Sequence, residues 1–201
     1  MKAVFSSLYA GNLDFYSCLL KADQIIIDVH ENYVKQSYRN RCEIYGANGK
    51  LALIIPIIRS SSTPMKEVKI DYDQNWQKIH WKSLESSYRS SPYFEFYEDK
   101  FIHLYEQKNI HYLVDFNMEL LNIFLKLLDL DIELSYTDSY EKEIKNKLDQ
   151  RSLIHPKMGT SQYYNENKYI QVFEEKMGFI PNLSIYDLVF NEGPAAVNIL
   201  G

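Results

Sequence analysis

The chain has 201 residues, with 27 acidic and 22 basic side chains, a net charge of -5, seven glycines and two cysteines. A chain of this length folds as one domain without needing a disulfide or a metal, so we expect a single domain over residues 1–201. The acidic balance argues against a nucleic-acid-binding protein. Neither of the two common glycine-rich phosphate-binding loops can be read in the sequence.

The sequence also argues against a membrane or secreted protein. The longest apolar run, residues 51–58, is far shorter than the roughly 20 residues of a membrane-spanning helix. The N-terminus MKAVF lacks the pattern of a signal peptide. Cys18 and Cys42 fit no disulfide or metal pattern. We therefore expect a cytoplasmic protein with no membrane span.

The first thirty residues predict a strand, a helix and a second strand. Residues 2–8 are typical of a short strand, and Asn12 suits the cap of a helix whose apolar residues continue to Ala22. The QIIIDV run at residues 24–29 is short and β-branched, which is typical of a buried strand. Strands joined by a helix favour a parallel βαβ unit.

Residues 36–58 predict a β-hairpin. The Asn48-Gly49 pair indicates a type I′ turn, in which both central residues have positive φ. That turn places Ile44 opposite Leu53 and Glu43 opposite Ile54. We expect the ladder to end near residue 55, because the proline that follows cannot donate a hydrogen bond.

The middle of the chain predicts helices. Trp76, His80, Leu84 and Tyr88 fall four apart and would share one helix face. A second helix is expected over residues 93–107. A third is expected to start from a cap at residue 115 or 117 and to run to residue 128.

The last third of the chain predicts a strand over residues 132–136 and a solvated helix or mobile loop over 140–150. A helix over 170–177 and a final strand or helix within 179–191 follow. The resulting fold class is α/β (or α+β), with a small sheet that opens with the βαβ unit, a β-hairpin and a helical middle section.

The most informative stretch for function is residues 30–50, where a histidine, two arginines and several amides concentrate. If residues 37–45 form a strand, Arg39, Arg41 and Glu43 lie on one face. Buried guanidinium groups need anions, and their planar shape suits carboxylate or phosphate. The arginines therefore either pair with Glu43 or another acid, or bind a diphosphate or carboxylate ligand.

Two further side chains in or near this stretch could carry chemistry. His30 ends the predicted QIIIDV strand, at the strand end where ligands bind in open α/β sheets. It is either a general base or a surface histidine. Cys42 is either a nucleophile or a buried, inert thiol. His80, on an apolar helix face, is expected to be a core residue.

The tail over residues 178–194 is a second dense region. Asn182 or Ser184 can cap a helix whose first turn contains Asp187. The helix either docks the C-terminus, or its N-terminus faces an anion while Asp187 orients a base.

Five segments, taken in order, resemble the WbqC-like family over nearly the whole chain. They are YVKQSYRNRCEIYGANGK at 33–50, the pattern NWxxxHW at 75–81, SPYFEFY at 91–97, DFNMEL at 115–120 and FIPNLSIYDLVFNEGP at 179–194. The chain is most similar to the branch common in Bacteroidetes-type bacteria. A more distant branch has a Q-P-Y-F-x-P segment where this chain has residues 7–12, and it need not have cysteine at the position of Cys42.

This resemblance implies an acyl or aminoacyl transferase that forms an amide on a nucleotide-linked amino sugar in surface polysaccharide biosynthesis. From the residues themselves, we expect His30 to act as the base and Asp187 to orient it, with no cofactor or metal. The small-molecule substrate would be held by Arg39, Asn40, Arg41, Tyr33, Tyr38, Gln36, Asn182 and Ser184. Because no ATP-binding loop is visible, the acyl donor would arrive already activated.

Two other functions remain open from the sequence. The chain could be a non-catalytic sugar- or nucleotide-binding partner of a polysaccharide assembly enzyme, because aromatic residues and arginines suit both roles. It could also be a cysteine hydrolase that acts through Cys42.

Overall fold

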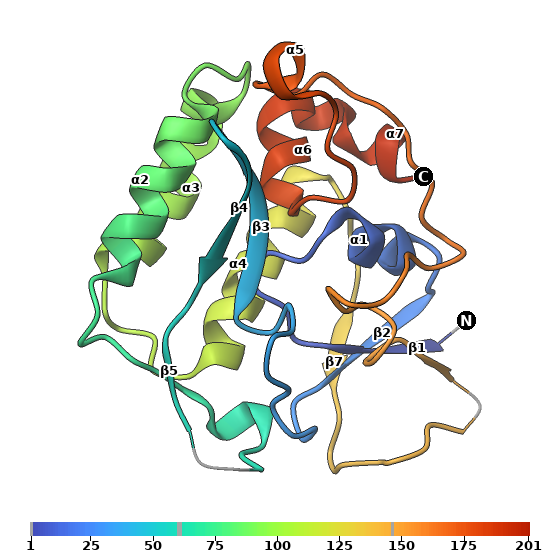
Figure 1. Ribbon diagram of the computed structural model, residues 1–201. Coiled ribbons are helices and arrows are strands. Elements are labelled where there is room, and N and C mark those ends of the chain that lie inside the picture. Colours follow the sequence, from blue (N-terminus) through green and yellow to red (C-terminus); the bar gives the residue numbers. More distant parts are fainter. Residues whose placement is uncertain (1, 60–61, 146) are drawn as a thin grey trace.

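The computed structural model describes residues 2–59, 62–145 and 147–201, and mixes helices with a parallel sheet and two antiparallel pairs of strands (Figure 1). The expected α/β class is confirmed. The parallel sheet has the order β7-β2-β1-β8. Its strands are β1 (Lys2–Ser6), β2 (Gln24–Asp28), β7 (Leu134–Tyr136) and β8 (Leu148–Asp149).

The predicted βαβ unit is confirmed. Helix α1 (Leu13–Leu20) connects β1 to β2, which pair in parallel from Lys2 opposite Gln24 to Ser6 opposite Asp28. The Asn12 side chain caps α1 by accepting a hydrogen bond from the backbone N–H of Phe15 at 3.2 Å. Strands β7 and β8 are also parallel to their neighbours. The carboxyl ends of all four strands therefore lie at one edge of the sheet.

The hairpin consists of β3 (Arg41–Gly46) and β4 (Gly49–Ile54), but the predicted register is wrong by two residues. Ile44 lies opposite Leu51, and Glu43 lies opposite Ala52. Within the turn, only Gly49 has a positive φ, of 98°. A type I′ turn needs two such residues, whereas one glycine with positive φ at the end of the loop is typical of a turn that closes on a bulge.

Strand β3 begins at Arg41, and residues 37–40 form turns rather than the first half of a strand. The expectation that Arg39, Arg41 and Glu43 alternate along one strand face is therefore wrong for Arg39. Gln36, just before these turns, has a positive φ of 55°. This turn sends Arg39 toward the parallel sheet, while Arg41 stays on the hairpin.

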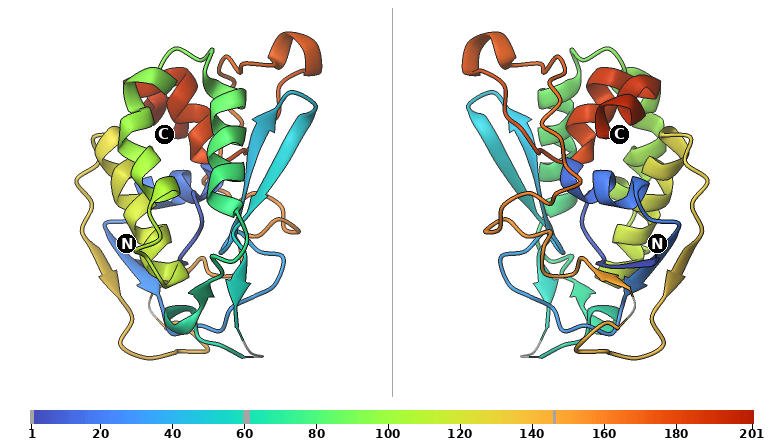
Figure 2. Two further views of the ribbon diagram at one scale, coloured as in Figure 1. Left: turned by 90° about the vertical axis from the view of Figure 1, so that its left-hand side faces the viewer. Right: turned by 90° about the vertical axis from the view of Figure 1, so that its right-hand side faces the viewer.

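The three predicted middle helices are present as α2 (Trp76–Tyr88), α3 (Phe94–Glu106) and α4 (Leu113–Leu127). The predicted cap of the third helix is wrong, because α4 begins two residues before Asp115. Figure 2 shows the β3–β4 hairpin standing beside α2, away from the parallel sheet. Between the hairpin and α2 the chain forms the short elements β5 (Ile57–Ile58), η1 (Met65–Glu67) and β6 (Lys69–Ile70).

The last third has less regular structure than predicted. In residues 140–150, apart from residue 146, which lies outside the described residues, the regular element is β8 rather than a helix. The helix expected over 170–177 is reduced to one turn, α5 (Glu174–Met177). The chain ends with α6 (Ile185–Glu192), η2 (Gly193–Ala195) and α7 (Ala196–Leu200).

The predicted apolar face of α2 is buried in a core rich in aromatic rings. His80 is part of it, as expected, and is 3% exposed. The hydroxyl of Tyr9 lies 2.9 Å from Nδ1 of His80 and 3.0 Å from the hydroxyl of Tyr105. Tyr105 in turn lies 2.8 Å from the hydroxyl of Tyr186. Buried tyrosines thus satisfy each other's polar groups, which lets the core hold so many of them.

Burial of His80 predicts a loss of stability in acid. Desolvation lowers its pKa from 6.5 to about 4, so the unfolded chain binds a proton that the folded chain does not. We expect this group to lower the free energy of unfolding by about 2 kcal/mol between about pH 7.5 and about pH 5. Urea unfolding of wild type and His80→Gln at both pH values measures it. Equal pH dependence in the two proteins would contradict the prediction.

Candidate functional site

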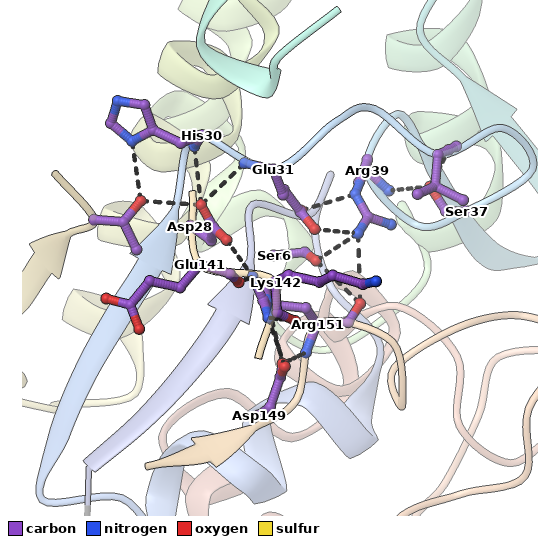
Figure 3. A network of polar contacts seen from close by, with 12 residues as sticks. Ser6, Asp28, His30, Glu31, Ser37, Arg39, Glu141, Lys142, Asp149 and Arg151 are labelled. Carbon is purple, nitrogen blue, oxygen red and sulfur yellow. Dashed lines mark hydrogen bonds and ion pairs between the residues drawn. The ribbon is translucent and has the colours of Figure 1, made fainter. Parts of the chain in front are cut away.

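The polar residues that follow β1, β2 and β8 gather at the carboxyl edge of the parallel sheet (Figure 3). In the sheet, β2 and β7 lie on one side of β1, and β8 lies on the other side. The carboxyl ends of β1 and β8 therefore mark the topological switch point, where open α/β sheets bind their ligands.

Asp28, the last residue of β2, is the centre of this cluster and is fully buried. Its Oδ1 accepts hydrogen bonds from the backbone N–H groups of His30 at 2.9 Å and Glu31 at 3.0 Å, and from the hydroxyl of Thr137 at 3.0 Å. Its Oδ2 accepts a hydrogen bond from Nη1 of Arg151 at 2.6 Å. One carboxylate thus fixes the loops after three strands.

Arg151 connects the segment before β8 to the sheet. Besides Asp28, it binds Asp149 through Nε at 2.9 Å and Nη2 at 2.6 Å, and it donates to the backbone carbonyls of Glu141 and Lys142. The hydrogen bonds to Asp149 and then Asp28 raise the pKa of Arg151. The guanidinium therefore stays charged.

Arg39 forms the second buried ion pair of the edge. Its Nε and Nη2 bind the two carboxylate oxygens of Glu31 at 2.9 and 2.6 Å, and Nη2 also donates to the hydroxyl of Ser6 at 2.8 Å. Arg41 belongs to a different network, in which Glu43 accepts from it at 2.5 Å and from Lys50 at 3.0 Å. The two arginines predicted to act together are thus paired separately.

The hydrogen bonds of His30 define its tautomer. The hydroxyl of Thr137 donates to Asp28, so toward Nδ1 of His30, 3.1 Å away, it acts as the acceptor. In the neutral ring, Nδ1 therefore carries the proton and Nε2 has the lone pair. A neutral histidine held in this way can accept a proton at Nε2.

A pocket of about 340 Å³ opens beside these ion pairs. Its polar and aromatic lining includes Arg39, Arg151, Lys142, Asp149, Tyr140 and His155. The guanidinium carbon of Arg151 lies 5.7 Å from the centre of the Tyr140 ring. Burial, followed by the charges of Arg39 and Lys157, lowers the pKa of His155. The imidazole is therefore neutral at neutral pH.

The predicted binding residues near Arg39 have mostly structural contacts. The hydroxyl of Tyr33 donates to Oδ1 of Asn40 at 2.8 Å, and Nδ2 of Asn40 donates to the backbone carbonyl of Ile55 at 2.9 Å. Burial raises the pKa of Tyr38, which is 7% exposed. Gln36 is exposed and accepts a hydrogen bond from Lys157 at 2.8 Å.

The predicted residues of the tail lie around α6 and α1. Ser184 donates to the carbonyl of Ala10 at 2.6 Å, and Oδ1 of Asn182 accepts from the backbone N–H of Asp14 at 3.0 Å. These contacts attach the start of α6 to the start of α1.

Asp187 is fully buried on α6. Its carboxylate accepts hydrogen bonds from the hydroxyls of Tyr88 at 2.8 Å and Tyr169 at 2.6 Å and from Gln171 at 2.8 Å. Burial raises its pKa to about 6. The structure does not bring His30 among these partners, so the two predicted catalytic residues lie in separate networks.

The two thiols lie apart from the pocket lining. Cys42 is 1% exposed, and burial raises its pKa. Burial also raises the pKa of Cys18 to about 12. Both thiols are thereby kept in the protonated form, which is a poor nucleophile.

Sequence reasoning found His30 and Arg39 at this edge but missed the acids and cations around them. Asp28 offered a signal, because an acid inside a buried apolar strand must meet a cation or several donors. Arg151, Asp149 and Lys142 had no such signal, because their segment looks like a solvated charged stretch.

The described residues contain neither a candidate metal site nor a helix that could span a membrane. No group of three or more His, Cys, Asp or Glu side chains is placed to hold a metal ion. Among the described helices, none combines the length and apolar character required to cross a bilayer.

The chain is similar to Rv1507c, an uncharacterized protein of Mycobacterium tuberculosis strain H37Rv, with 26% identity over 227 aligned positions that cover 98% of this chain and 96% of that protein. No solved structure matches significantly. Residues 7–199 match the sequence profile of the WbqC-like protein family. The match covers almost the whole chain, which therefore belongs to the WbqC-like protein family.

Proposed function

We propose that the protein transfers an acyl or aminoacyl group from an activated donor to the amino group of a nucleotide-linked amino sugar, in bacterial surface polysaccharide biosynthesis. The observation that carries this proposal is that Asp28 connects two features of the site. It binds the backbone of His30 and the hydroxyl of Thr137, and it binds Arg151, which lines a pocket rich in hydrogen-bond donors. Membership of the WbqC-like family supports the substrate class.

The proposed reaction begins at the ammonium group of the sugar. Nε2 of His30 accepts one proton, which frees the nitrogen lone pair to attack the acyl carbonyl. A carbon–nitrogen bond forms and the bond from the acyl carbon to the donor's sulfur or oxygen breaks. The second proton lost by the nitrogen leaves with the donor's thiol or hydroxyl.

The residues at the edge divide these tasks. Asp28, through Thr137, takes the orienting role that the sequence suggested for Asp187, because Thr137 is the residue that binds Nδ1 of His30. Arg39 keeps the proposed substrate-binding role, and Arg151 and Lys142 line the same pocket. The ring of Tyr140 offers a surface on which a sugar or base can stack.

Product formation tests the proposal directly. The purified protein is incubated with a panel of nucleotide-linked amino sugars and with acyl thioesters or aminoacyl-tRNA as donors. Mass spectrometry is expected to show the nucleotide sugar gaining one acyl or aminoacyl group, in a form that resists hydroxylamine as amides do. If no donor yields such a product while a nucleotide sugar still binds, the transferase proposal is overturned.

A non-catalytic binding module is the second candidate. It is favoured by the fact that His30 is not among the residues that line the pocket, whereas Arg39 and Lys142 are. This candidate predicts that a nucleotide-linked amino sugar binds without turnover and that His30→Gln leaves the affinity unchanged. Isothermal titration calorimetry on wild type and variant measures both.

A further inference from the structure

The carboxylates around the pocket have little capacity left to accept hydrogen bonds from a ligand. Both oxygens of Glu31 accept from Arg39, and both oxygens of Asp149 accept from Arg151. Asp28, behind them, has both oxygens occupied and is fully buried. The acids therefore orient the two arginines and do not offer a site for a cation.

Several donors, in contrast, remain unused. Arg39 is 3% exposed and lines the pocket, and its Nη1 has no hydrogen-bond partner among the described residues. Lys142 lines the same pocket, and its Nζ has no ion-pair or hydrogen-bond partner among the described residues. The remaining N–H groups of Arg39 and the ammonium group of Lys142 can therefore donate to a ligand or to water.

His155 adds a third donor. Its Nδ1 accepts a hydrogen bond from the backbone N–H of Lys157 at 3.2 Å, so the proton of the neutral ring is on Nε2. His155 lines the pocket together with Arg39 and Lys142. Figure 3 shows the Lys142 side chain extending past Arg151 on the same side as Arg39.

We infer that this pocket binds a phosphoryl group, with Nη1 of Arg39, Nζ of Lys142 and Nε2 of His155 as its donors. Donors from three separate side chains suit oxygens that point in several directions, such as the four non-bridging oxygens on the two phosphorus atoms of a diphosphate diester, whereas a carboxylate presents two oxygens in one plane. The inference rests on the proposed function for the molecule that bears the group, which would be the diphosphate of the nucleotide sugar.

Binding of inorganic pyrophosphate, inorganic phosphate and a nucleoside diphosphate, with acetate as the carboxylate, tests the inference by calorimetry. No acyl donor is present, so the result is independent of whether the protein is a transferase. We expect pyrophosphate and the nucleoside diphosphate to bind and acetate not to bind. Acetate that binds as tightly as pyrophosphate, or binding of neither pyrophosphate nor phosphate, would overturn the inference. Phosphate binding alone would identify free phosphate as the source.

Two exposed lysines of one segment provide a matched pair of variants. Lys142→Ala removes a proposed donor, whereas Lys145→Ala removes an equal charge that does not line the pocket. We expect Lys142→Ala to weaken pyrophosphate binding by about tenfold, as a lost charge-assisted contact would, and Lys145→Ala to change it by less than about twofold. Equal effects of the two substitutions would mean that the pocket is not the site.

The imidazole gives a readout that does not depend on a substitution. Burial, and then the charges of Arg39 and Lys157, lower the pKa of His155. A bound phosphoryl group places negative charge beside the ring, so its pKa is expected to rise in the complex. NMR titration of the His155 ring protons with and without pyrophosphate measures the change. An unchanged pKa at saturating pyrophosphate would place the anion elsewhere.

Discussion

Replacing Arg151 with methionine is expected to lower the free energy of unfolding by about 3–5 kcal/mol. The substitution keeps most of the side-chain volume but leaves the carboxylate of Asp28, which is fully buried, without its cation. It also releases Asp149 and the carbonyls of Glu141 and Lys142. Urea unfolding at neutral pH, followed by tryptophan fluorescence, measures the loss.

Arg89→Met is the matched control. Arg89 also contacts more than one acid, Glu85 and Glu98, but its side chain is 47% exposed, so water replaces the lost partners. We expect the free energy of unfolding to change far less than in Arg151→Met, because exposed ion pairs contribute little. If Arg151→Met costs no more than Arg89→Met, the Asp28–Arg151 pair does not hold the edge together.

A double variant separates the pair from the rest of the network. Removing the charge of Asp28 as well, in Asp28→Asn with Arg151→Met, leaves no unpaired buried carboxylate. The double variant is expected to be more stable than the sum of the two single losses predicts.

Local signals made the parallel core of the fold predictable. The QIIIDV strand and the capped helix before it are read from neighbouring residues, and a strand, a helix and a strand can pair in parallel in few ways. The hairpin register was not predictable in the same way. Gly49 serves either a type I′ turn or a bulged loop, and the choice depends on how the strands pack.

The same limit applies to the site. His30 could be placed because it ends a recognisable strand, and Arg39 because a buried arginine needs an anion. Glu31, the carboxylate that pairs with Arg39, lies in the turn after β2. Arg151, the second arginine of the edge, comes from a segment more than a hundred residues later. Charged residues that pair across such a distance look the same in sequence as solvated ones.

His30→Gln is expected to lower kcat for amide formation by about 10²–10⁴-fold, the range for loss of a general base. Glutamine retains a polar side chain of similar length but cannot accept the proton that leaves the sugar ammonium. KM for the nucleotide sugar is expected to change little, because the residues that line the pocket remain. His111→Gln is the control, since His111 is exposed and lies outside this cluster.

Thr137 is a positioning residue, and its variants test the hydrogen-bond chain rather than the base itself. In Thr137→Val the ring loses the acceptor that fixes its Nδ1–H tautomer, so kcat is expected to fall while KM is maintained. Thr137→Ser keeps the hydroxyl and is expected to recover most of the rate. Because valine matches threonine in shape, a purely structural role for the side chain would leave the valine variant active and impair the serine variant, which lacks the methyl group. That result would mean that the hydroxyl of Thr137 does not orient His30 for the reaction.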